Sequence, residues 1–153
     1  FDDTIHTSLV NGGIPEWLAK ILASRLDKAI DANLLYSNEL ADIEDPSNIP
    51  DMDIAVKRIV EAIKNEERIV LVCDHDMDGT GSAAVLWEAL TGYFNVNEAL
   101  IRVVTSHRLT EGYGITEPVA QRIIELKPSL VISADKGSSD EPRIKKIKES
   151  GID

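Results

Sequence analysis

The sequence has little that would tie it to a membrane, an oxidising compartment or a nucleic-acid backbone. Its 153 residues include one cysteine, Cys73, so no internal disulfide can form and we expect a reducing cytoplasm. No stretch approaches the ~18 uninterrupted apolar residues that a membrane-spanning helix needs, so no membrane association is expected. Basic side chains are scarce, since 16 Lys and Arg face 27 Asp and Glu for a net charge of −11. Phosphate backbones normally require clustered Lys and Arg, so composition alone disfavours a stand-alone nucleic-acid-binding domain.

The rest of the composition is that of one folded domain. A hydrophobic share of 43% beside 28% charged residues is typical of a globular chain rather than a disordered one. The chain begins at Phe1 without a methionine and ends at Asp153, directly after an expected helix stop at Gly151, so we expect a piece of a longer protein. The acidic excess is also compatible with a binding site for divalent cations, because carboxylates gather where such ions bind.

The chain divides into two regions that differ in their pattern of apolar residues. Residues 1–50 are expected to form a helical leader, with one helix that starts at Pro15 and packs through Trp17 and Leu26, and another over 28–40. Residues 51–153 are expected to form an α/β domain. An apolar, β-branched run predicts a buried strand at 68–73, and further strands are predicted at 100–105 and 129–134. Helical periodicity predicts helices at 51–63, 79–94, 116–126 and 143–149. Strands that alternate with helices predict a parallel sheet with flanking helices.

Polar, glycine-containing segments follow all three predicted strands, at residues 74–81, 106–114 and 135–140. The carboxyl ends of parallel strands meet at one edge of the sheet, where ligands bind in open α/β folds. Each segment contains carboxylates, and like charges gathered in one place repel. A divalent cation removes that repulsion, and oxygen ligands suit Mg²⁺ or Mn²⁺. The sequence therefore predicts a metal site at this edge.

The first of these segments carries aspartates at alternate positions, Asp74, Asp76 and Asp78. If the chain stays extended, the three carboxylates lie on one side, and a helix begins at Gly79 with free backbone amides that could hold a phosphate. A plain acidic helix cap would need one carboxylate rather than three. A calcium-binding EF-hand also begins Asp-x-Asp-x-Asp-Gly, but its twelfth position would be Val85 rather than glutamate. A strand rather than a helix also precedes the motif, so the EF-hand is excluded.

Other residues near the strand ends are further candidates. Asp135, after the third strand, is the natural partner of the first carboxylates. The Arg108 guanidinium matches phosphate oxygens, although a lone loop arginine is more often a surface charge. His75 and His107 could ligate a metal, exchange protons or serve a structural role. Cys73, at the end of a buried strand, is expected in the core rather than as a nucleophile.

Three motifs follow one another along the chain. The first is Asp-His-Asp-Met-Asp-Gly-Thr at 74–80, the second is Arg108 followed by Glu-Gly-Tyr-Gly at 111–114, and the third is Ile-Ser-Ala-Asp-Lys-Gly at 132–137. Together they resemble the DHH phosphoesterase family, whose first motif is usually Asp-Tyr-Asp-x-Asp-Gly and whose second aspartate motif is a strand ending in Asp-x-Gly. The Arg-x-x-Glu-Gly-Tyr-Gly loop is similar to that of the RecJ-like exonucleases within this family. The resemblance covers most of the chain.

The resemblance implies metal-dependent hydrolysis of phosphodiester bonds, typically with Mn²⁺ or Mg²⁺. It implies Asp76, Asp78 and Asp135 as catalytic metal ligands, with Asp74 ligating or orienting beside them. The residues implied to contact substrate are His75, His107, Arg108, Glu111, Gly112, Tyr113, Gly114 and Gly137. RecJ-like members degrade single-stranded DNA from the 5′ end in recombination and repair, so single-stranded DNA is the implied partner of the full-length protein.

The sequence departs from the family pattern at several places. His75 stands where tyrosine is common, Ser106-His107 where Pro-Asn is common, and Lys136 where a small or apolar residue is usual. The Asp-His-His motif that names the family is absent, and the chain ends just before the place where relatives carry it. We therefore expect a domain truncated before that motif, which alone binds metal weakly and has little or no nuclease activity.

Two other functions remain open. One is a DHH phosphodiesterase that acts on short oligonucleotides or cyclic dinucleotides, and the Glu-Gly-Tyr-Gly loop favours the exonuclease over it. The other is a non-catalytic scaffold of replication or repair. The clustered aspartates argue against a scaffold, which would have no need for them.

Overall fold

The computed structural model describes residues 2–26, 41 and 43–153. The chain divides into two compact units, residues 1–50 and residues 51–153, and each is described by itself. The helix expected over 28–40 lies outside the described residues. Across the described ranges, no helix is both long and apolar enough to span a bilayer.

The first unit contains a pair of helices, α1 (Asp3–Asn11) and α2 (Glu16–Ala23), and a short 3-10 helix, η2 (Pro46–Asn48). Its small core is built from Ile5, Leu9, Ile14, Ala19 and Ala23, with Leu18, Leu22 and Leu26 packed against it. The expected packing of Trp17 is wrong, because this side chain is 67% exposed. Residues spaced by four on a helix share a face. Ala19 and Ala23 are buried and Leu18 and Leu22 are partly buried against the same core, while Trp17 and Ile21 face solvent.

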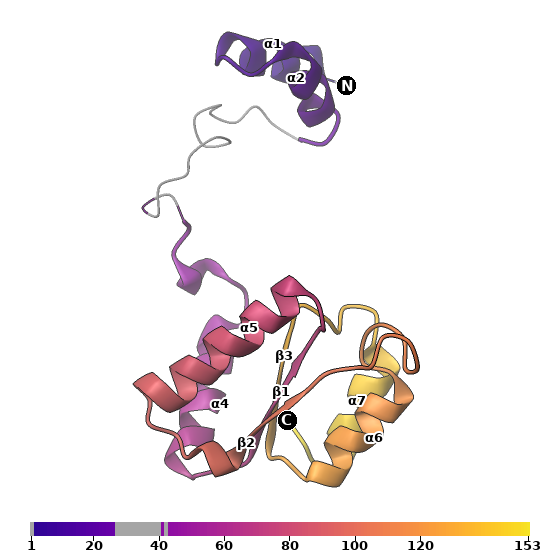
Figure 1. The fold of residues 1–153 in the computed structure, drawn as a ribbon. Helices are drawn as coiled ribbons and strands as arrows, with labels where there is room; N and C mark the ends of the chain where they lie inside the picture. The colour runs from indigo at the N-terminus through magenta and orange to yellow at the C-terminus, as the bar shows by residue number, and fades with distance from the viewer. Residues whose placement is uncertain (1, 27–40, 42) are drawn as a thin grey trace. The chain divides into compact units, whose positions relative to one another are not determined.

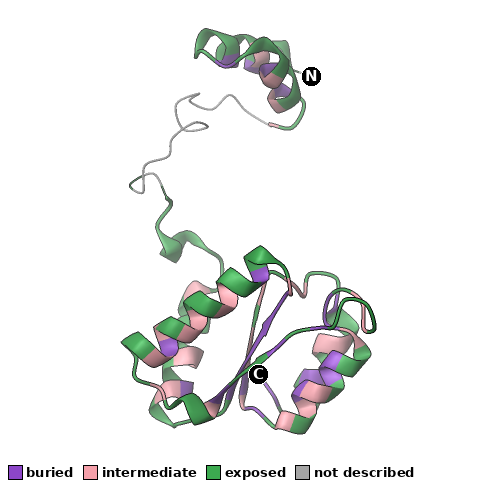
Figure 2. Cartoon of the chain, in the orientation of Figure 1, coloured by how far each residue is buried: buried purple, intermediate pink, exposed green. Residues whose placement is uncertain are grey.

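The second unit is organised around a three-stranded, fully parallel sheet in the order β2-β1-β3 (Figure 1). The strands are β1 (Ile69–Cys73), β2 (Ile101–Val104) and β3 (Leu130–Ala134), each within one or two residues of its expected position. All five residues of the central strand β1 are buried, which explains why its sequence is uniformly apolar rather than alternating (Figure 2). The expected α/β class with a parallel sheet is confirmed.

Helices cover both faces of this sheet (Figure 1). Helices α4 (Met52–Lys64) and α5 (Met77–Glu88) lie on one face, and α6 (Glu117–Leu126) and α7 (Glu141–Glu149) lie on the other. Side chains of β1 alternate between the two cores, with Ile69, Leu71 and Cys73 on the α4–α5 side and Val70 and Val72 on the α6–α7 side. Cys73 is thus a core residue, as expected. A π-helical turn, η3 (Ala89–Tyr93), and a 3-10 turn, η4 (Glu98–Leu100), lead from α5 to β2.

Candidate metal centre

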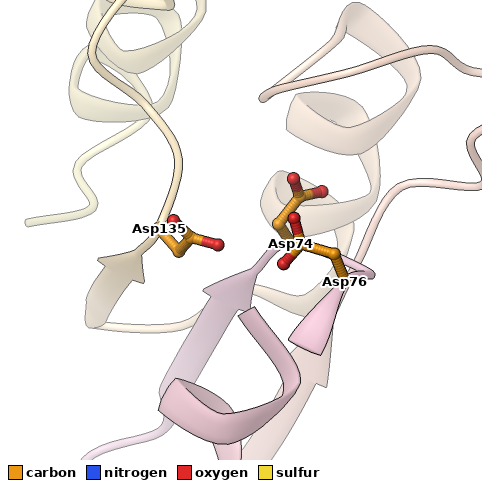
Figure 3. Close-up of side chains that lie close together, drawn as sticks. All are labelled: Asp74, Asp76 and Asp135. Carbon is orange, nitrogen blue, oxygen red and sulfur yellow. The ribbon is translucent and has the colours of Figure 1, made fainter. Parts of the chain in front are cut away.

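Three carboxylates meet at the carboxyl edge of the sheet. Asp74 follows β1 directly, Asp76 comes two residues later, and Asp135 follows β3. One carboxylate oxygen of each lies within 4.8 Å of the others (Figure 3). Strand pairing produces this arrangement, because Cys73 and Ala134 are register partners and the residues after them share one edge. Oxygens that bind one hard cation at about 2.0–2.6 Å are at most about 5 Å apart, so this cluster fits a divalent ion.

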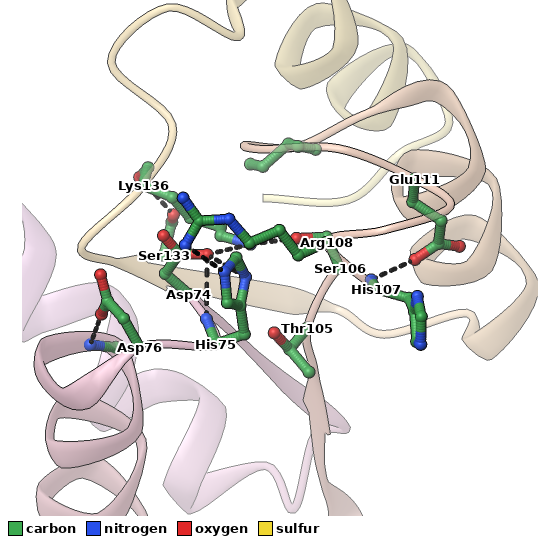
Figure 4. Close-up of polar contacts among 12 residues, drawn as sticks. Asp74, His75, Asp76, Thr105, Ser106, His107, Arg108, Glu111, Ser133 and Lys136 are labelled. Carbon is green, nitrogen blue, oxygen red and sulfur yellow. Dashed lines mark hydrogen bonds and ion pairs between the residues drawn. The ribbon is translucent and has the colours of Figure 1, made fainter.

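Asp74 is the buried member of the cluster, with a side chain only 1% exposed. Its Oδ1 accepts a hydrogen bond from the His75 backbone amide at 2.9 Å (Figure 4). The same oxygen lies 2.9 Å from Nδ1 of His75, as a close polar contact rather than an aligned hydrogen bond, and 3.5 Å from Nζ of Lys136. These contacts hold the carboxylate in one orientation and surround one of its oxygens with donors.

Asp76 has two roles, as a cluster member and as the N-cap of α5. Its Oδ1 accepts from the Gly79 amide at 3.0 Å, and this hydrogen bond is the main cause that holds the pKa of Asp76 below its usual value. Gly79 is required here because a Cβ at this position would lie 2.3 Å from the backbone oxygen of Asp74. The helix therefore starts directly against the end of β1, and it positions both carboxylates.

The expectation for Asp78 needs correction. Helix α5 begins at Met77 rather than Gly79, so the extended alternation ends at Asp76 and Asp78 lies in the first helical turn. The clustered oxygens come from Asp74, Asp76 and Asp135 without Asp78, whose metal role stays a prediction. The expected free amides are also wrong at Thr80, whose N–H donates to the Asp76 carbonyl at 2.9 Å. The physical reason is the capping by Asp76, which moves the start of the helix earlier in the chain.

Asp135 occupies a strained and electrostatically unfavourable position. Its backbone is left-handed, with φ of 60°, a conformation that Asp tolerates better than most residues. Partial desolvation, followed by the nearby Asp76 carboxylate, raises the pKa of Asp135. The Asp76 carboxylate has this effect because like charges that share a site disfavour each other's ionisation. A bound divalent ion would relieve this conflict.

The loop after β2 brings Arg108 toward the cluster. Its guanidinium Nη1 lies 3.2 Å from Nε2 of His75, which links it through that ring to Asp74 (Figure 4). The Glu111 carboxylate is held within the protein: Arg122 donates to its two oxygens at 2.6 and 3.1 Å, and the His107 amide donates to one of them. These donors lower the pKa of Glu111 to about 2. Glu111 therefore fixes the conformation of this loop, and its contact with substrate stays a prediction.

A polar pocket of about 440 Å³ opens beside Asp135 and is lined by Tyr113, Asp135, Lys136, Gly137, Ser138, Ser139 and Asp140. Tyr113 is 67% exposed, and the charge of Asp74 is the main cause that raises the pKa of its hydroxyl. Gly112, Gly114 and Gly137 all have positive φ. At Gly114 a Cβ would also lie 2.8 Å from the Asp140 carboxylate, so only glycine fits.

Several residues that build this edge were not expected to do so. Asp140 is buried, accepts from the Ile115 amide at 2.7 Å and pairs with Arg143 at 2.6 Å, so it ties the Tyr113 loop to α7. Arg122 on α6 holds Glu111. Lys136 departs from the family pattern, but nothing in the sequence around it indicates that its side chain turns inward. The only available signal for Asp140 was its place before a helix, which indicates a cap rather than a loop anchor.

Comparison with known proteins agrees with this geometry. No protein-family model matches the chain. The curated single-stranded-DNA-specific exonuclease RecJ of Bacillus subtilis (strain 168) is 33% identical over 137 residues, which cover 89% of this chain and 17% of that protein. The RecJ of Haemophilus influenzae is 33% identical over 109 residues, or 70% of this chain and 18% of that protein. The chain therefore spans less than a fifth of the length of these curated relatives.

A solved structure shows the same likeness in three dimensions. A crystal structure of exonuclease RecJ bound to manganese matches 65% of this chain and 25% of its own, with a TM-score of 0.57 and 25% identity. With the strand-end aspartates and the parallel sheet, these likenesses place the chain in the DHH phosphoesterase family. Within that family it is a RecJ-like segment.

Proposed function

We propose that this segment supplies metal-binding carboxylates to a phosphodiester hydrolase that degrades single-stranded DNA in the 5′→3′ direction. The observation that carries the proposal is the meeting of Asp74, Asp76 and Asp135 within 4.8 Å, in a chain one-third identical to RecJ exonucleases. Its place would be the cytoplasm, in DNA recombination and repair. The likeness to RecJ favours this activity over a cyclic-dinucleotide phosphodiesterase or a scaffold.

Asp74, Asp76 and Asp135 would hold Mn²⁺ or Mg²⁺, with Asp78 reaching in from the first turn of α5. When bound, such ions activate water at neutral pH and stabilise charge on the scissile phosphate. The protein's own contribution is to keep these carboxylates close together. The hydrogen bond from the Gly79 amide lowers the pKa of Asp76, and a bound cation would offset the desolvation and the neighbouring carboxylate that raise the pKa of Asp135.

Arg108 is the residue that we propose to contact the DNA phosphate. Its exposed guanidinium is near the cluster through His75, and guanidinium groups match phosphate oxygens in a bidentate way. Tyr113 and Gly137 line the adjoining pocket and would bound the path of the strand. His107 and Glu111 contribute indirectly, because their contacts shape the loop that carries Arg108.

We also propose that the 153-residue chain alone binds metal weakly and hydrolyses little DNA. The support is its coverage, since the matched segment makes up 17% and 18% of the curated exonucleases. Grooves that bind a single strand combine positive charge with aromatic side chains, and an acidic segment of net charge −11 supplies little positive surface itself.

Two measurements test the proposal. Calorimetric titration with Mn²⁺ should show binding by the chain, weakened on the order of tenfold to a hundredfold or more by Asp135→Asn, because a ligand is lost. Glu149→Gln is the matched control, since it removes one carboxylate that is 66% exposed at the far end of α7. Equal affinity in the Asp135→Asn and Glu149→Gln variants would reject the metal centre.

The second measurement addresses the activity. The matched segment of the Bacillus subtilis exonuclease is replaced by this chain, and the chimera is assayed on single-stranded oligonucleotides labelled at either end. We expect Mn²⁺-dependent release of nucleotides from the 5′ end, lost in the Asp135→Asn chimera and retained in the Glu149→Gln chimera. Digestion from the 3′ end, or activity that survives Asp135→Asn, would contradict the proposed activity.

A further inference from the structure

One buried ammonium group joins the ends of all three strands. Lys136 follows Asp135 at the end of β3, and its side chain has no exposed surface. Its Nζ donates to Oγ of Ser106, after β2, at 3.2 Å and lies 3.5 Å from Oδ1 of Asp74, after β1 (Figure 4). A positive charge is therefore already present inside the acidic cluster.

The burial of this pair shows that each charge depends on the other. Charged groups withdrawn from water need a partner, and removing one partner leaves the other uncompensated. Asp74 is 1% exposed and Lys136 is 0% exposed, so neither can turn to solvent. Arg108 contacts His75 rather than Asp74, and the other charges that line this edge, Asp76 and Asp135, are negative. Lys136 thus supplies the ammonium group that lies beside Asp74.

The contacts of Asp74 also show where a cation would compete. Both the His75 amide and the Lys136 ammonium approach Oδ1, the oxygen that His75 Nδ1 also contacts. A divalent ion in the cluster would take a place close to this ammonium, and like charges a few ångströms apart inside a protein repel strongly. The Lys136 ammonium and a metal ion would therefore compete for the Asp74 carboxylate.

We propose that Lys136 is a built-in counter-ion of the metal centre: it neutralises Asp74 when no metal is bound and opposes metal binding through its charge. This inference rests on the proposed function and deepens it. Lys136 acts as a positioning residue, because it holds Asp74 at the strand ends. It leaves Asp76 and Asp135 as the carboxylates on which metal affinity chiefly depends, and it keeps that affinity low.

Replacing the ammonium tests the proposal, because a counter-ion and a purely structural side chain differ in their effect on metal affinity. Lys136→Met keeps an unbranched side chain of similar length and removes the charge. We expect the metal-free variant to melt at a lower temperature, since Asp74 loses its partner. We expect the same variant to bind Mn²⁺ more tightly, on the order of tenfold, since the repulsion is gone. The rise in melting temperature on adding Mn²⁺ should be larger in the variant than in the wild-type chain.

Controls separate this effect from a change in overall charge. Lys145→Met removes one positive charge from a side chain that is 73% exposed on α7, and it should leave Mn²⁺ affinity unchanged. Asp74→Asn should cancel the gain, so the double variant Asp74→Asn/Lys136→Met should bind no more tightly than Asp74→Asn alone. A gain that survives Asp74→Asn would show that Lys136 does not act through this carboxylate, and it would overturn the proposal.

The remaining outcomes distinguish failure of the counter-ion role from failure of the metal centre. If the wild-type and Lys136→Met chains bind Mn²⁺ equally, or the variant binds more weakly, the metal centre stands and the counter-ion role is refuted. If neither chain binds Mn²⁺, the metal centre itself is wrong and the inference falls with it. Should Lys136→Met not fold, nitrogen-15 NMR of the lysine ammonium groups in the wild-type chain replaces it. Mg²⁺ should then shift the Lys136 signal and leave that of Lys145 in place, and an unmoved Lys136 signal would refute the role.

Discussion

Gly79 lies in the first turn of α5 against the backbone of Asp74, and replacing it tests how the site is positioned. A Cβ at residue 79 would lie 2.3 Å from the backbone oxygen of Asp74 and 2.5 Å from its backbone carbon and nitrogen. Because these are backbone atoms, either the helix or the strand end must move. Gly81, two residues along the same helix, offers a matched control, because a Cβ there meets no atom within 4 Å.

The two glycines should respond to alanine with opposite signs. Overpacking typically costs about 1–3 kcal/mol, and contacts this short with backbone belong at the upper end. Alanine in an unobstructed helix gains about 1 kcal/mol over glycine. We therefore expect Gly79→Ala to lower the free energy of unfolding by about 2–3 kcal/mol and Gly81→Ala to raise it by up to about 1 kcal/mol.

Urea unfolding of the second unit measures this difference. In a Trp17→Phe background, Trp87 on α5 is the remaining tryptophan and its fluorescence reports this unit. With a denaturant slope of about 1–3 kcal/mol per molar urea, the midpoints of the two variants should differ by about 1 M or more. Gly79→Ala should also weaken Mn²⁺ binding, because the displaced turn carries Asp76. Equal midpoints for the two variants would refute the steric argument.

Two further predictions concern the loops that frame the centre. Glu111 has a pKa of about 2 against an ordinary 4.5, so the folded state binds its proton less tightly than the unfolded state does. The stabilisation that ionised Glu111 gives is therefore complete above about pH 5 and is lost as the pH falls from 4.5 toward 2. In Glu111→Gln this part of the pH dependence of the free energy of unfolding should vanish. An unchanged dependence between pH 5 and 2 would contradict the assignment. Asp140→Asn should lower the free energy of unfolding by about 1–3 kcal/mol, because the buried Ile115 amide and Arg143 lose a charged acceptor. Glu149→Gln, which breaks an exposed 3.9 Å pair, should change it by less than about 0.5 kcal/mol, and equal effects in thermal or urea unfolding would argue against Asp140 as an anchor.

The sequence was sufficient to predict the sheet and the meeting of two carboxylates. A strand buried on both faces requires a continuous apolar run, so β1 was recognisable, and the largely apolar sequence of β3 also indicated a strand. The carboxyl ends of parallel strands lie at the same edge of the sheet. Asp74 and Asp135 could therefore be paired without coordinates. Asp78 was placed wrongly because the start of α5 depends on whether Asp76 caps it, and an alternating motif fits both the extended and the capped conformation.

The residues that sequence analysis missed depend on side-chain direction or on loop conformation. Lys136 follows Asp135 along the chain, and only the left-handed backbone at Asp135 and the packing around it decide that the lysine turns inward. The Glu111 and Arg122 pair joins a loop to a helix, and no periodicity links the two positions. Trp17 was misplaced because apolar residues occur on several neighbouring rows of α2, and the row of Trp17 and Ile21 is the exposed one.

The pairing of β1 with β3 has a consequence for how the centre comes into being. Asp76 and Asp135 belong to segments separated by α5, β2 and α6, so no stretch of the nascent chain carries the site by itself. Parallel pairing over such a separation is a slow step in folding, since loop closure must come before any contact rewards it. In the proposed function, metal would therefore bind only after tertiary assembly, and each bound ion would stabilise the folded state by mass action. A metal-loaded centre would therefore indicate that β1 and β3 have paired correctly.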